Sequence, residues 1–325
     1  MIRTVAGRLA LAMAGVLVVA SARGEVFDLP DNGDTVVGRV ITVQSREWDT
    51  LLDIARRHGL GYHDIVRANP DVDPWLPGDG TEVVLPARFI LPDVPREGVV
   101  LNLPEYRMYY FPPAEADGTR TVMTFPISIG RMDWETPLGL TRVTRKAKDP
   151  AWYPPESVRQ EHLADGRPPL PRVVPPGPDN PLGRFAIRLA IPGYLIHGTN
   201  RPAGVGMRVT HGCIRMFPED IEFAFGHIPV GTPVRIIDEP YKFGWYGGQL
   251  LMEAHEPLEN AAEEGAEAGV SALTRLTELY VAATGERRIE VNWDRVEALH
   301  RAADGVPRRV DAAGDGSETL VADRE

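Results

Sequence analysis

Proline is the residue that most limits how this chain can fold. The sequence contains thirty prolines, ten of them from Lys146 to Pro181. Proline lacks a backbone N–H and fixes φ, so it breaks helices and stays at the edges and ends of strands. We therefore expect short strands and many loops, with residues 146–181 forming a long loop without regular structure. Such a loop is either a lid or wall beside a binding cleft or a passive insertion.

The first 22 residues have the pattern of a secretory signal peptide. Arg3 and Arg8 precede an apolar run from Leu9 to Ala20, and residues 20–22 read A-S-A, which fits a cleavage site. The apolar run is too short to span a bilayer as a helix. A cleaved signal is therefore favoured over an uncleaved membrane anchor, and we expect the protein to be exported.

Cys213 is the only cysteine in the chain. Cysteines of exported proteins normally pair as disulfides, and a single cysteine has no partner within its own chain. A free thiol in an oxidising compartment is a disadvantage to the protein unless the thiol has a function. This favours a functional Cys213 over the alternative of a small buried hydrophobic side chain.

Two histidines precede this cysteine, His197 by sixteen residues and His211 by two. A thiol beside an imidazole that takes its proton is the minimum apparatus for nucleophilic attack on a carbonyl, because an ordinary thiol is only about 3% ionised at pH 7. We expect one histidine to be the base, forming a reactive ion pair with the thiol, and the other to be structural. The amides of Gly212 and Cys213 could form an oxyanion hole. A zinc site that includes His227 is the alternative, but no C-x-x-C or H-E-x-x-H motif supports it.

Charge and length limit the class of protein. A net charge of −11 argues against nucleic acid as a partner, because non-specific binding to nucleic acid depends on basic surface. Hydrophobic residues make up 43% of the chain, which is enough for real cores. Without the signal peptide, the length suggests two domains with extensions.

Residues 38–87 are expected to form a small α/β unit of βααβ order. Val40–Val43 alternates like a strand, and Thr50 with Asp53 fits a capping box before a helix at Leu51–His58. A second helix is expected from 63 to 68 and a closing strand from 81 to 86, and the proline-rich residues 89–97 are expected to be a linker.

This unit resembles a LysM module, a domain that binds N-acetylglucosamine-containing glycan strands. The matching pieces are D-T-L-L-D-I-A, R-A-N-P and the final V-V-L-P, whereas Trp48 stands in place of the usual glycine before Asp49. A spacer domain without glycan binding is the alternative, since fold alone does not establish function.

Four motifs follow in order between Glu97 and Asp238. They are F-P-I-S-I-G (125–130), T-P-L-G (136–139), I-H-G-T-N (196–200) and R-V-T-H-G-C-I-R-M (208–216). Together they resemble the L,D-transpeptidase (YkuD-type) catalytic domain of bacterial cell-wall enzymes. The resemblance implies a mainly β, sandwich-like catalytic domain with short helices over residues 97–239.

The resemblance also implies roles for individual residues. Cys213 would be the nucleophile and His197 the general base, oriented by the backbone carbonyl of Gly198. The positions that would line the oxyanion and substrate-binding site are Thr210, His211, Gly212 and Arg215. A guanidinium at Arg215 could hold a substrate carboxylate.

The implied reaction is acyl transfer on peptidoglycan stem peptides, a transferase step of cell-wall organisation and cell shape in the periplasm. Cys213 would attack the third residue of a tetrapeptide stem, release D-alanine and form a thioester. A second stem as acceptor would give a 3-3 cross-link, and a lysine of an outer-membrane lipoprotein would give attachment to the wall. A carboxypeptidase, a thiol hydrolase that releases wall-linked lipoprotein, and a non-catalytic wall-binding protein are the alternatives. No metal or other cofactor is implied, and the family's cysteine is a carbapenem target.

The end of the chain changes character. A hairpin is expected to turn at Gly247-Gly248, and residues 240–301 should add a helical extension, with helices over Leu258–Gly285 and Trp293–Ala302. Residues 302–325 are polar and acidic without periodicity, so we expect a disordered tail there.

Overall fold

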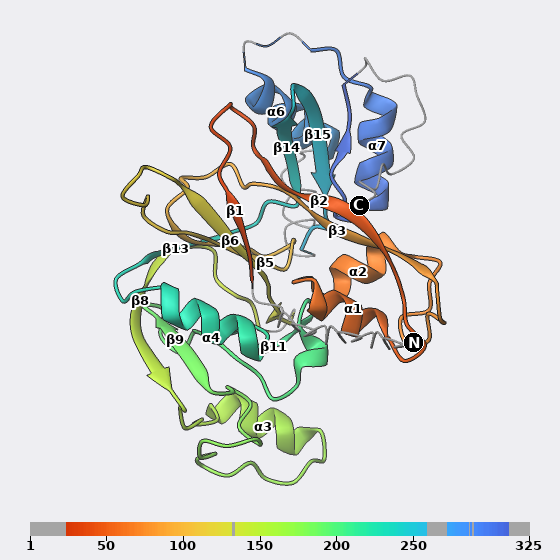
Figure 1. The fold of residues 1–325 in the computed structure, drawn as a ribbon. Coiled ribbons are helices and arrows are strands. Elements are labelled where there is room, and N and C mark those ends of the chain that lie inside the picture. The colour runs from red at the N-terminus through yellow and green to blue at the C-terminus, as the bar shows by residue number, and fades with distance from the viewer. Residues whose placement is uncertain (1–23, 132–133, 259–271, 286, 288, 312–325) are drawn as a thin grey trace, which may run out of the picture.

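The computed structural model describes residues 24–131, 134–258, 272–285, 287 and 289–311 (Figure 1). The expected signal peptide (residues 1–22) and residues 312–325 of the expected tail lie outside the described residues. The strands are β1 (Glu25–Asp28), β2 (Val36–Gln44), β3 (Glu82–Ile90), β4 (Gly98–Asn102), β5 (Arg107–Phe111), β6 (Thr121–Pro126), β7 (Ile129–Gly130), β8 (Gly139–Lys148), β9 (Phe185–Leu189), β10 (Leu195–His197), β11 (Arg208–Thr210), β12 (Ile214–Arg215), β13 (Pro233–Ile237), β14 (Tyr241–Tyr246), β15 (Gln249–Ala254) and β16 (Arg308–Arg309). The helices are α1 (Leu51–Arg57), α2 (Tyr62–Ala68), α3 (Glu156–Ala164), the 3₁₀ helix η1 (Pro202–Gly204), α4 (Pro218–His227), α6 (Ala272–Thr284) and α7 (Trp293–Ala302). None of the helices described is long and apolar enough to cross a membrane.

Nine strands form one sheet in the order β1-β6-β5-β4-β13-β8-β9-β10-β12. Most neighbours are antiparallel, but β13 pairs in parallel with β4, and β10 pairs in parallel with β12. The chain is mainly β, as its sequence predicts. Among the strands that were not expected are β1, which pairs with β6 at one edge, and β8, whose only buried residue is Val143. A largely exposed strand lacks the alternation by which strands are recognised.

Both faces of the sheet are covered at β4 and β5. Val99 and Leu101 belong to one cluster of buried side chains, and Val100 between them belongs to a second. In β5, Tyr110 belongs to the first cluster and Tyr109 to the second, because successive side chains of a strand point to opposite faces. Every residue of these two strands is therefore buried, and the aromatic run in β5 is core and not a binding surface.

The βααβ order expected for residues 38–87 is present. β2 and β3 pair antiparallel from Val36↔Ile90 to Gln44↔Glu82, with α1 and α2 between them in the chain. The predicted capping box begins α1: the Thr50 side chain accepts from the Asp53 amide, and the Asp53 side chain accepts from the Thr50 amide.

This βααβ unit is not a separate body on a linker. Leu51 of α1 and Leu85 of β3 belong to the same buried cluster as Val100 of the nine-stranded sheet. The expected linker over residues 89–97 is wrong at its start, because β3 continues to Ile90 and Phe89 is buried in that cluster. The prolines that suggested a linker lie beyond the end of the strand.

The unit also contacts the loop that precedes Cys213. The amide of Tyr62, at the start of α2, donates to the carbonyl oxygen of Val205 at 3.0 Å. Gly206 has φ of +87°, and a Cβ there would lie 2.3 Å from the nitrogen of Tyr62, so the approach requires glycine. Arg56 of α1 binds Glu219 of α4 through two hydrogen bonds of 2.6 and 2.8 Å. The loop at residues 205–206 is therefore held against the start of α2, and α1 is held against α4.

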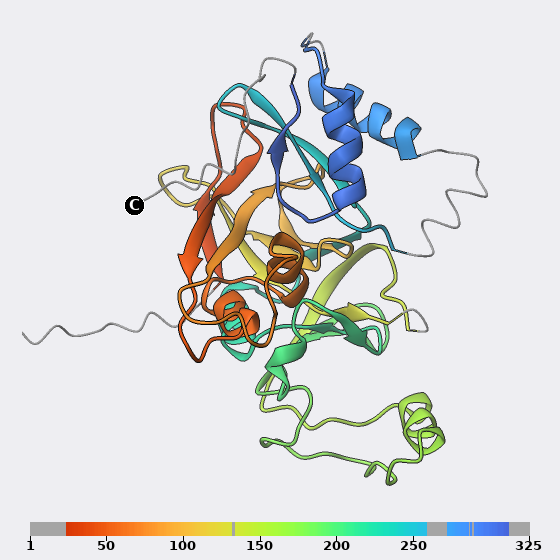
Figure 2. The ribbon, with the colours of Figure 1, turned by 90° about the vertical axis from the view of Figure 1, so that its right-hand side faces the viewer.

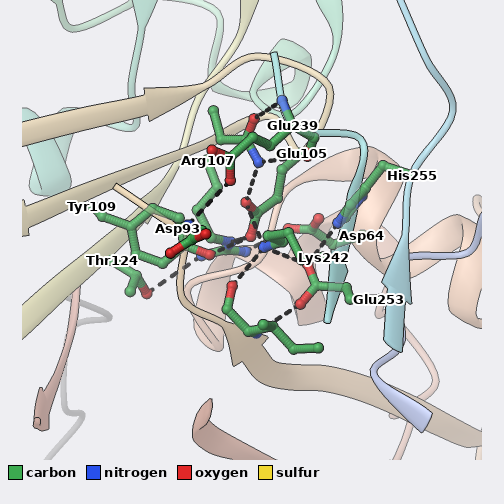
Figure 3. Close-up of polar contacts among 12 residues, drawn as sticks. Asp64, Asp93, Glu105, Arg107, Tyr109, Thr124, Glu239, Lys242, Glu253 and His255 are labelled. Carbon is green, nitrogen blue, oxygen red and sulfur yellow. Dashed lines mark hydrogen bonds and ion pairs between the residues drawn. The ribbon is translucent and has the colours of Figure 1, made fainter. Parts of the chain in front are cut away.

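A cluster of buried or nearly buried polar side chains joins three parts of the chain, and we call it the lysine network (Figure 3). Its members come from α2, from the segment entering β5 and β5 itself, and from the β14–β15 hairpin and the residue after it. They are Asp64, Glu105, Arg107, Tyr109, Lys242, Glu253 and His255.

Lys242 is the centre of this network. Its Nζ lies 2.9 Å from Glu105 Oε2 and 2.8 Å from Glu253 Oε1, and donates to the carbonyl oxygen of Ile90 at 2.7 Å. Burial alone would lower the pKa of Lys242, but the two carboxylates outweigh it and raise that pKa. The ammonium therefore stays charged inside the protein.

The C-terminal part adds a third core against the far ends of β2 and β3. The expected hairpin is present, with β14 paired to β15 around Gly247 and Gly248, both at positive φ. Helix α6 lies in the second half of the helix expected over Leu258–Gly285, of which residues 259–271 lie outside the described residues, and α7 lies where a helix was expected. Both contribute to the buried cluster of this hairpin. The expected disorder from residue 302 is wrong for residues 302–311, because β16 pairs with β15 and Val310 is buried.

Residues 146–181 are not wholly irregular, which corrects the sequence-based expectation. β8 continues to Lys148, and α3 occupies residues 156–164. Only Val158 of α3 is buried, so the helix has no apolar stripe by which its sequence could reveal it. Figures 1 and 2 show α3 and its flanking loops extending from the end of the molecule opposite α6 and α7.

Asp220 of α4 is expected to make the stability of the fold depend on pH. It is almost wholly buried, one of its carboxyl oxygens has no hydrogen-bond partner among the described residues, and burial raises its pKa to about 8. An aspartate in the unfolded chain ionises near pH 3.9, so folding is weakened as the pH rises from about 4 through 8. We expect Asp220→Asn to increase the free energy of unfolding by several kcal/mol at pH 8, at about 1.4 kcal/mol per pKa unit, and little at pH 4. Urea unfolding at both pH values measures this, and an equal gain at both would contradict it.

Candidate active site

His197 and Cys213 lie on neighbouring strands at the end of the nine-stranded sheet. β10 ends at His197, and β12 begins at Ile214, directly after Cys213. The strands pair in parallel, with Ile196 opposite Ile214 and His197 opposite Arg215. Alternate residues of a strand point to one face, and paired residues point the same way. His197, Cys213 and Arg215 therefore share one face of the sheet.

The imidazole of His197 is held by the backbone. The ring is buried, and its Nδ1 lies 2.6 Å from the carbonyl oxygen of Gly198, the contact that the resemblance led us to expect. A carbonyl oxygen only accepts, so Nδ1 carries the proton and Nε2 presents a lone pair, as a general base requires. Burial, with a smaller effect of the nearby Arg215 charge, lowers the pKa of His197 to about 4. The ring is therefore neutral at pH 7.

The thiol of Cys213 is also expected to be uncharged at pH 7. It is partly buried, and its Sγ lies 3.6 Å from the carbonyl oxygen of Gly193. Burial raises the pKa of the thiol, although the backbone of Leu195 and the charge of Arg215 act in the opposite direction. Burial therefore opposes the expected preformed ion pair in the resting protein, because it penalises both the thiolate and the imidazolium.

Three sequence motifs meet beside Cys213. A Cβ at Gly130 would lie 2.9 Å from the Cα of Gly212 and 1.9 Å from the carbonyl oxygen of Trp134. Gly212 has φ of +91°, and its carbonyl oxygen accepts from Thr136 Oγ1 at 2.8 Å. F-P-I-S-I-G, T-P-L-G and T-H-G-C are thus packed together, which explains why they carry glycine and threonine at these positions.

Thr210 stabilises the turn that carries Cys213. Its Oγ1 donates to the carbonyl oxygen of Cys213 at 2.6 Å. Within the described part of the chain, no hydrogen bond is made by the amides of Gly212 and Cys213. Two N–H groups beside a nucleophile are what an oxyanion hole needs. The structure therefore offers these two donors.

His211 is brought to the site, but its ring faces α3. Its Nε2 lies 2.7 Å from Glu161 Oε2, and its ring packs edge-on against Trp134, with centroids 5.1 Å apart. Glu161 also accepts a hydrogen bond from Arg131 Nη2. His211 therefore connects the catalytic loop to the 146–181 segment, and His197 is the histidine whose free nitrogen suits the base.

A cavity of about 400 Å³ lies next to these residues. Arg131, Arg167, Arg201 and Arg215 line it, together with His211 and Glu161. Arg131 and Arg201 directly follow the motifs F-P-I-S-I-G and I-H-G-T-N, and this adjacency could have identified them from sequence. Glu161 and Arg167 lie in the proline-rich segment, where no sequence signal marks them.

The described residues contain one group of side chains with the spacing of a metal site. Glu105, Glu253 and His255 have ligand atoms within 4.8 Å of one another. Lys242 Nζ lies between the two carboxylates, so a cation already occupies that place. The zinc site considered from sequence has no support from His227, whose Nδ1 lies 2.7 Å from the Phe223 carbonyl within α4.

Glu161 is expected to hold the 146–181 segment over the site. Its bonds to Arg131 and His211 are partly exposed, so they should contribute at most about 1 kcal/mol each. We expect Glu161→Gln to change the free energy of unfolding little, but to speed amide hydrogen exchange across α3 several-fold. Glu156→Gln, on the same helix, breaks only a local contact with Arg159 and is the matched control. Equal exchange in the two variants would show that Glu161 does not hold the segment.

Comparison with known proteins places these features in context. Residues 96–236 match the model of the YkuD family, described as the L,D-transpeptidase catalytic domain. The Salmonella typhimurium protein named "Probable L,D-transpeptidase ErfK/SrfK" is 40% identical over 295 residues, which cover 89% of this chain and 92% of that protein. "Probable L,D-transpeptidase YbiS" of Escherichia coli K12 is 41% identical, over 82% of this chain and 87% of that protein.

Similarity to solved structures is weaker. The crystal structure of an L,D-transpeptidase from Mycobacterium tuberculosis H37Rv is 19% identical, with a TM-score of 0.30 over 49% of this chain and 64% of that one. A likeness at this level adds nothing to the sequence matches.

Proposed function

This chain belongs to the YkuD family of L,D-transpeptidases, and from that premise we propose that Cys213 forms a thioester with peptidoglycan stem peptides. The observation that carries the proposal is the arrangement of His197 and Cys213 on one face of two paired strands, with Nδ1 of the imidazole bonded to the Gly198 carbonyl. This arrangement leaves Nε2 able to take the thiol proton.

The first half-reaction begins from the neutral pair. As Sγ of Cys213 attacks the carbonyl of the third stem residue, its proton passes to Nε2 of His197. The carbonyl oxygen becomes an oxyanion, which the amides of Gly212 and Cys213 would stabilise. When the intermediate collapses, the C–N bond to D-alanine breaks, and the imidazolium gives its proton to the leaving amine. A thioester remains on Cys213.

The second half-reaction reverses these roles. An amine of the acceptor attacks the thioester, His197 takes the amine proton, and the C–S bond breaks to restore the thiol. A diaminopimelate amine as acceptor gives a 3-3 cross-link, and a lysine of a lipoprotein gives attachment to the wall. Carbapenems are expected to acylate the same sulfur.

The βααβ unit is proposed to bind the glycan strand as a LysM-like module. Trp48 and Trp75 lie on its two loops and are exposed, at 85% and 58%. The amide of Leu51 donates to the carbonyl oxygen of Pro74 at 2.9 Å, which brings these loops together. Exposed indole rings offer flat apolar faces on which a sugar ring can pack. Export by residues 1–22 to the periplasm, where the wall lies, completes the proposal.

Mass spectrometry of the products tests the reaction. The purified protein is incubated with a defined tetrapeptide stem, alone and with a peptide that ends in the lysine of a lipoprotein. A dimer of stems indicates cross-linking, a mixed product indicates attachment, and loss of D-alanine alone indicates a carboxypeptidase. Absence of any of these, with intact stem recovered, would overturn the proposal.

The pH dependence of kcat/KM should show the environment of His197. Because the pKa of the ring is lowered to about 4, activity should persist well below pH 6.5 and fall only as the pH approaches 4, where Nε2 becomes protonated. Alkylation of Cys213 by iodoacetamide gives the complementary measurement, since a thiol with a raised pKa should react slowly at pH 7. Fast, pH-independent alkylation between pH 5 and 7 would instead indicate a resting ion pair.

A further inference from the structure

The cavity lined by His211 and Arg215 contrasts in charge with the chain as a whole. The whole sequence has a net charge of −11, yet four arginines line this one cavity. Glu161 is the only acidic residue in its lining. The question is which of these arginines already have acidic partners.

Two of the four arginines are neutralised within the protein. Arg131 bonds Glu161, and Arg167 lies 2.5 Å from Asp165. Arg201 and Arg215 have no acidic partner among the described residues. Arg201 is exposed, and it comes from the loop after β10, whereas Arg215 ends β12.

The surroundings of Arg215 are unfavourable for its positive charge. Its Nε is buried without a hydrogen-bond partner among the described residues. Burial, and then the like charge of Arg201, lower the pKa of its guanidinium. A half-buried cation with a buried, unused donor and a second cation nearby is unfavourable unless an anion binds there. The geometry therefore points to an anionic ligand between the two arginines.

The position of Arg215 indicates which part of a ligand would carry that anion. Arg215 follows Cys213 by two residues on the same face of the sheet, so the anion would lie close to the carbonyl under attack. In the donor peptide, the terminal carboxylate of the leaving residue is separated from that carbonyl only by the scissile nitrogen and one Cα.

We propose that Arg201 and Arg215 bind the C-terminal carboxylate of the acyl-donor peptide, and so select donors that end one residue beyond the attacked carbonyl. This inference rests on the proposed function, since it assumes a peptide donor. Arg201 is a specificity-determining residue in this scheme. A guanidinium pair suits a carboxylate, because each arginine can present two parallel N–H donors to it.

Three donor peptides distinguish the terminal carboxylate from the others. The first is a tetrapeptide stem with all carboxylates free, the second has only its C-terminus amidated, and the third has a free C-terminus and amidated side-branch carboxylates. For the native protein, we expect the first and third peptides to be acylated efficiently and the second to be poor. If the third were the poor donor instead, the arginines would bind a side-branch carboxylate and the proposal would fail.

Variants then assign the effect to Arg201. We expect Arg201→Ala to lower kcat/KM for the free-acid donor by about 10- to 100-fold, the worth of a hydrogen bond to a charged group, and to leave the amidated donor unchanged. Arg201→Lys should retain part of the effect. Arg142, an exposed arginine of β8, provides Arg142→Ala as the matched control. Equal losses on both donors would contradict selection by Arg201.

Peptide binding, measured in a variant that cannot form the thioester, tests this proposal separately from the proposed acyl transfer. In protein that carries Cys213→Ala, the dissociation constant of the free-acid tetrapeptide should rise about tenfold or more on adding Arg201→Ala, and should rise at higher salt. If the affinity depended on the terminal carboxylate but the native protein showed no turnover, carboxylate binding by Arg201 and Arg215 would be supported and the proposed acyl transfer would be contradicted. If the native protein turned over the donor and Arg201→Ala had no effect, the acyl transfer would be supported and carboxylate binding by Arg201 would be contradicted.

Discussion

Cys213→Ala is expected to abolish acyl transfer, lowering kcat/KM on the order of 10³-fold or more. The variant keeps the oxyanion donors and the binding cavity but has no sulfur to form the thioester. Intact-mass measurement after incubation with a carbapenem should show a single covalent adduct on the native protein and none on the variant. An adduct of equal yield on the variant would show that another residue is the nucleophile.

The two histidines provide a matched comparison for this result. His197→Gln should lower kcat/KM by about 10²- to 10⁴-fold, the usual contribution of a general base. His211→Gln removes an imidazole from the same loop but one that bonds Glu161, so its loss should be much smaller. The reverse order would mean that His211 takes the proton.

Lys242→Met is expected to reduce the free energy of unfolding by about 3 to 5 kcal/mol. Methionine fills a similar volume but leaves the carboxylates of Glu105 and Glu253 buried without their cation. Burial opposes ionisation of Glu105, and the ammonium of Lys242 is the main reason why its pKa is nevertheless lowered. Urea unfolding followed by circular dichroism measures the change.

Two further variants identify the cause of that loss. Lys148→Met removes an exposed lysine from the end of β8 and should cost less than about 0.5 kcal/mol. Adding Glu105→Gln and Glu253→Gln to Lys242→Met removes the unpaired charges and should recover part of the stability. A loss below about 1 kcal/mol for Lys242→Met would indicate that the network contributes little.

The sequence predicted the parts of the fold that are periodic and buried on one side. The capping box of α1 and the hairpin at Gly247 were both expected where they occur. The sequence did not predict β8 or α3, because neither buries enough side chains to create a pattern. Nor did the sequence predict the buried core that the βααβ unit shares with the nine-stranded sheet, since a shared core depends on contacts between segments far apart in the chain.

The site was predicted where local motifs define it. The contact between His197 and Gly198 links adjacent residues, so a motif can carry it. The neutral state of the thiol and imidazole could not be predicted, because it depends on burial by the whole fold. The same is true of the cavity, whose four arginines come from four separate segments between residues 131 and 215.

The direct packing of α2 against the loop at residues 205–206 has a consequence for how the enzyme would reach stem peptides along peptidoglycan. A wall-binding module on a flexible tether raises the local supply of stem peptides but does not choose among them. Here, Trp48 and Trp75, which we propose to bind the glycan strand, lie on a unit that shares a buried core with the nine-stranded sheet, so that core holds their separation from Cys213. Under that proposal, a glycan strand bound at the two tryptophans would bring only the stem peptides at one set distance along the strand within reach of Cys213.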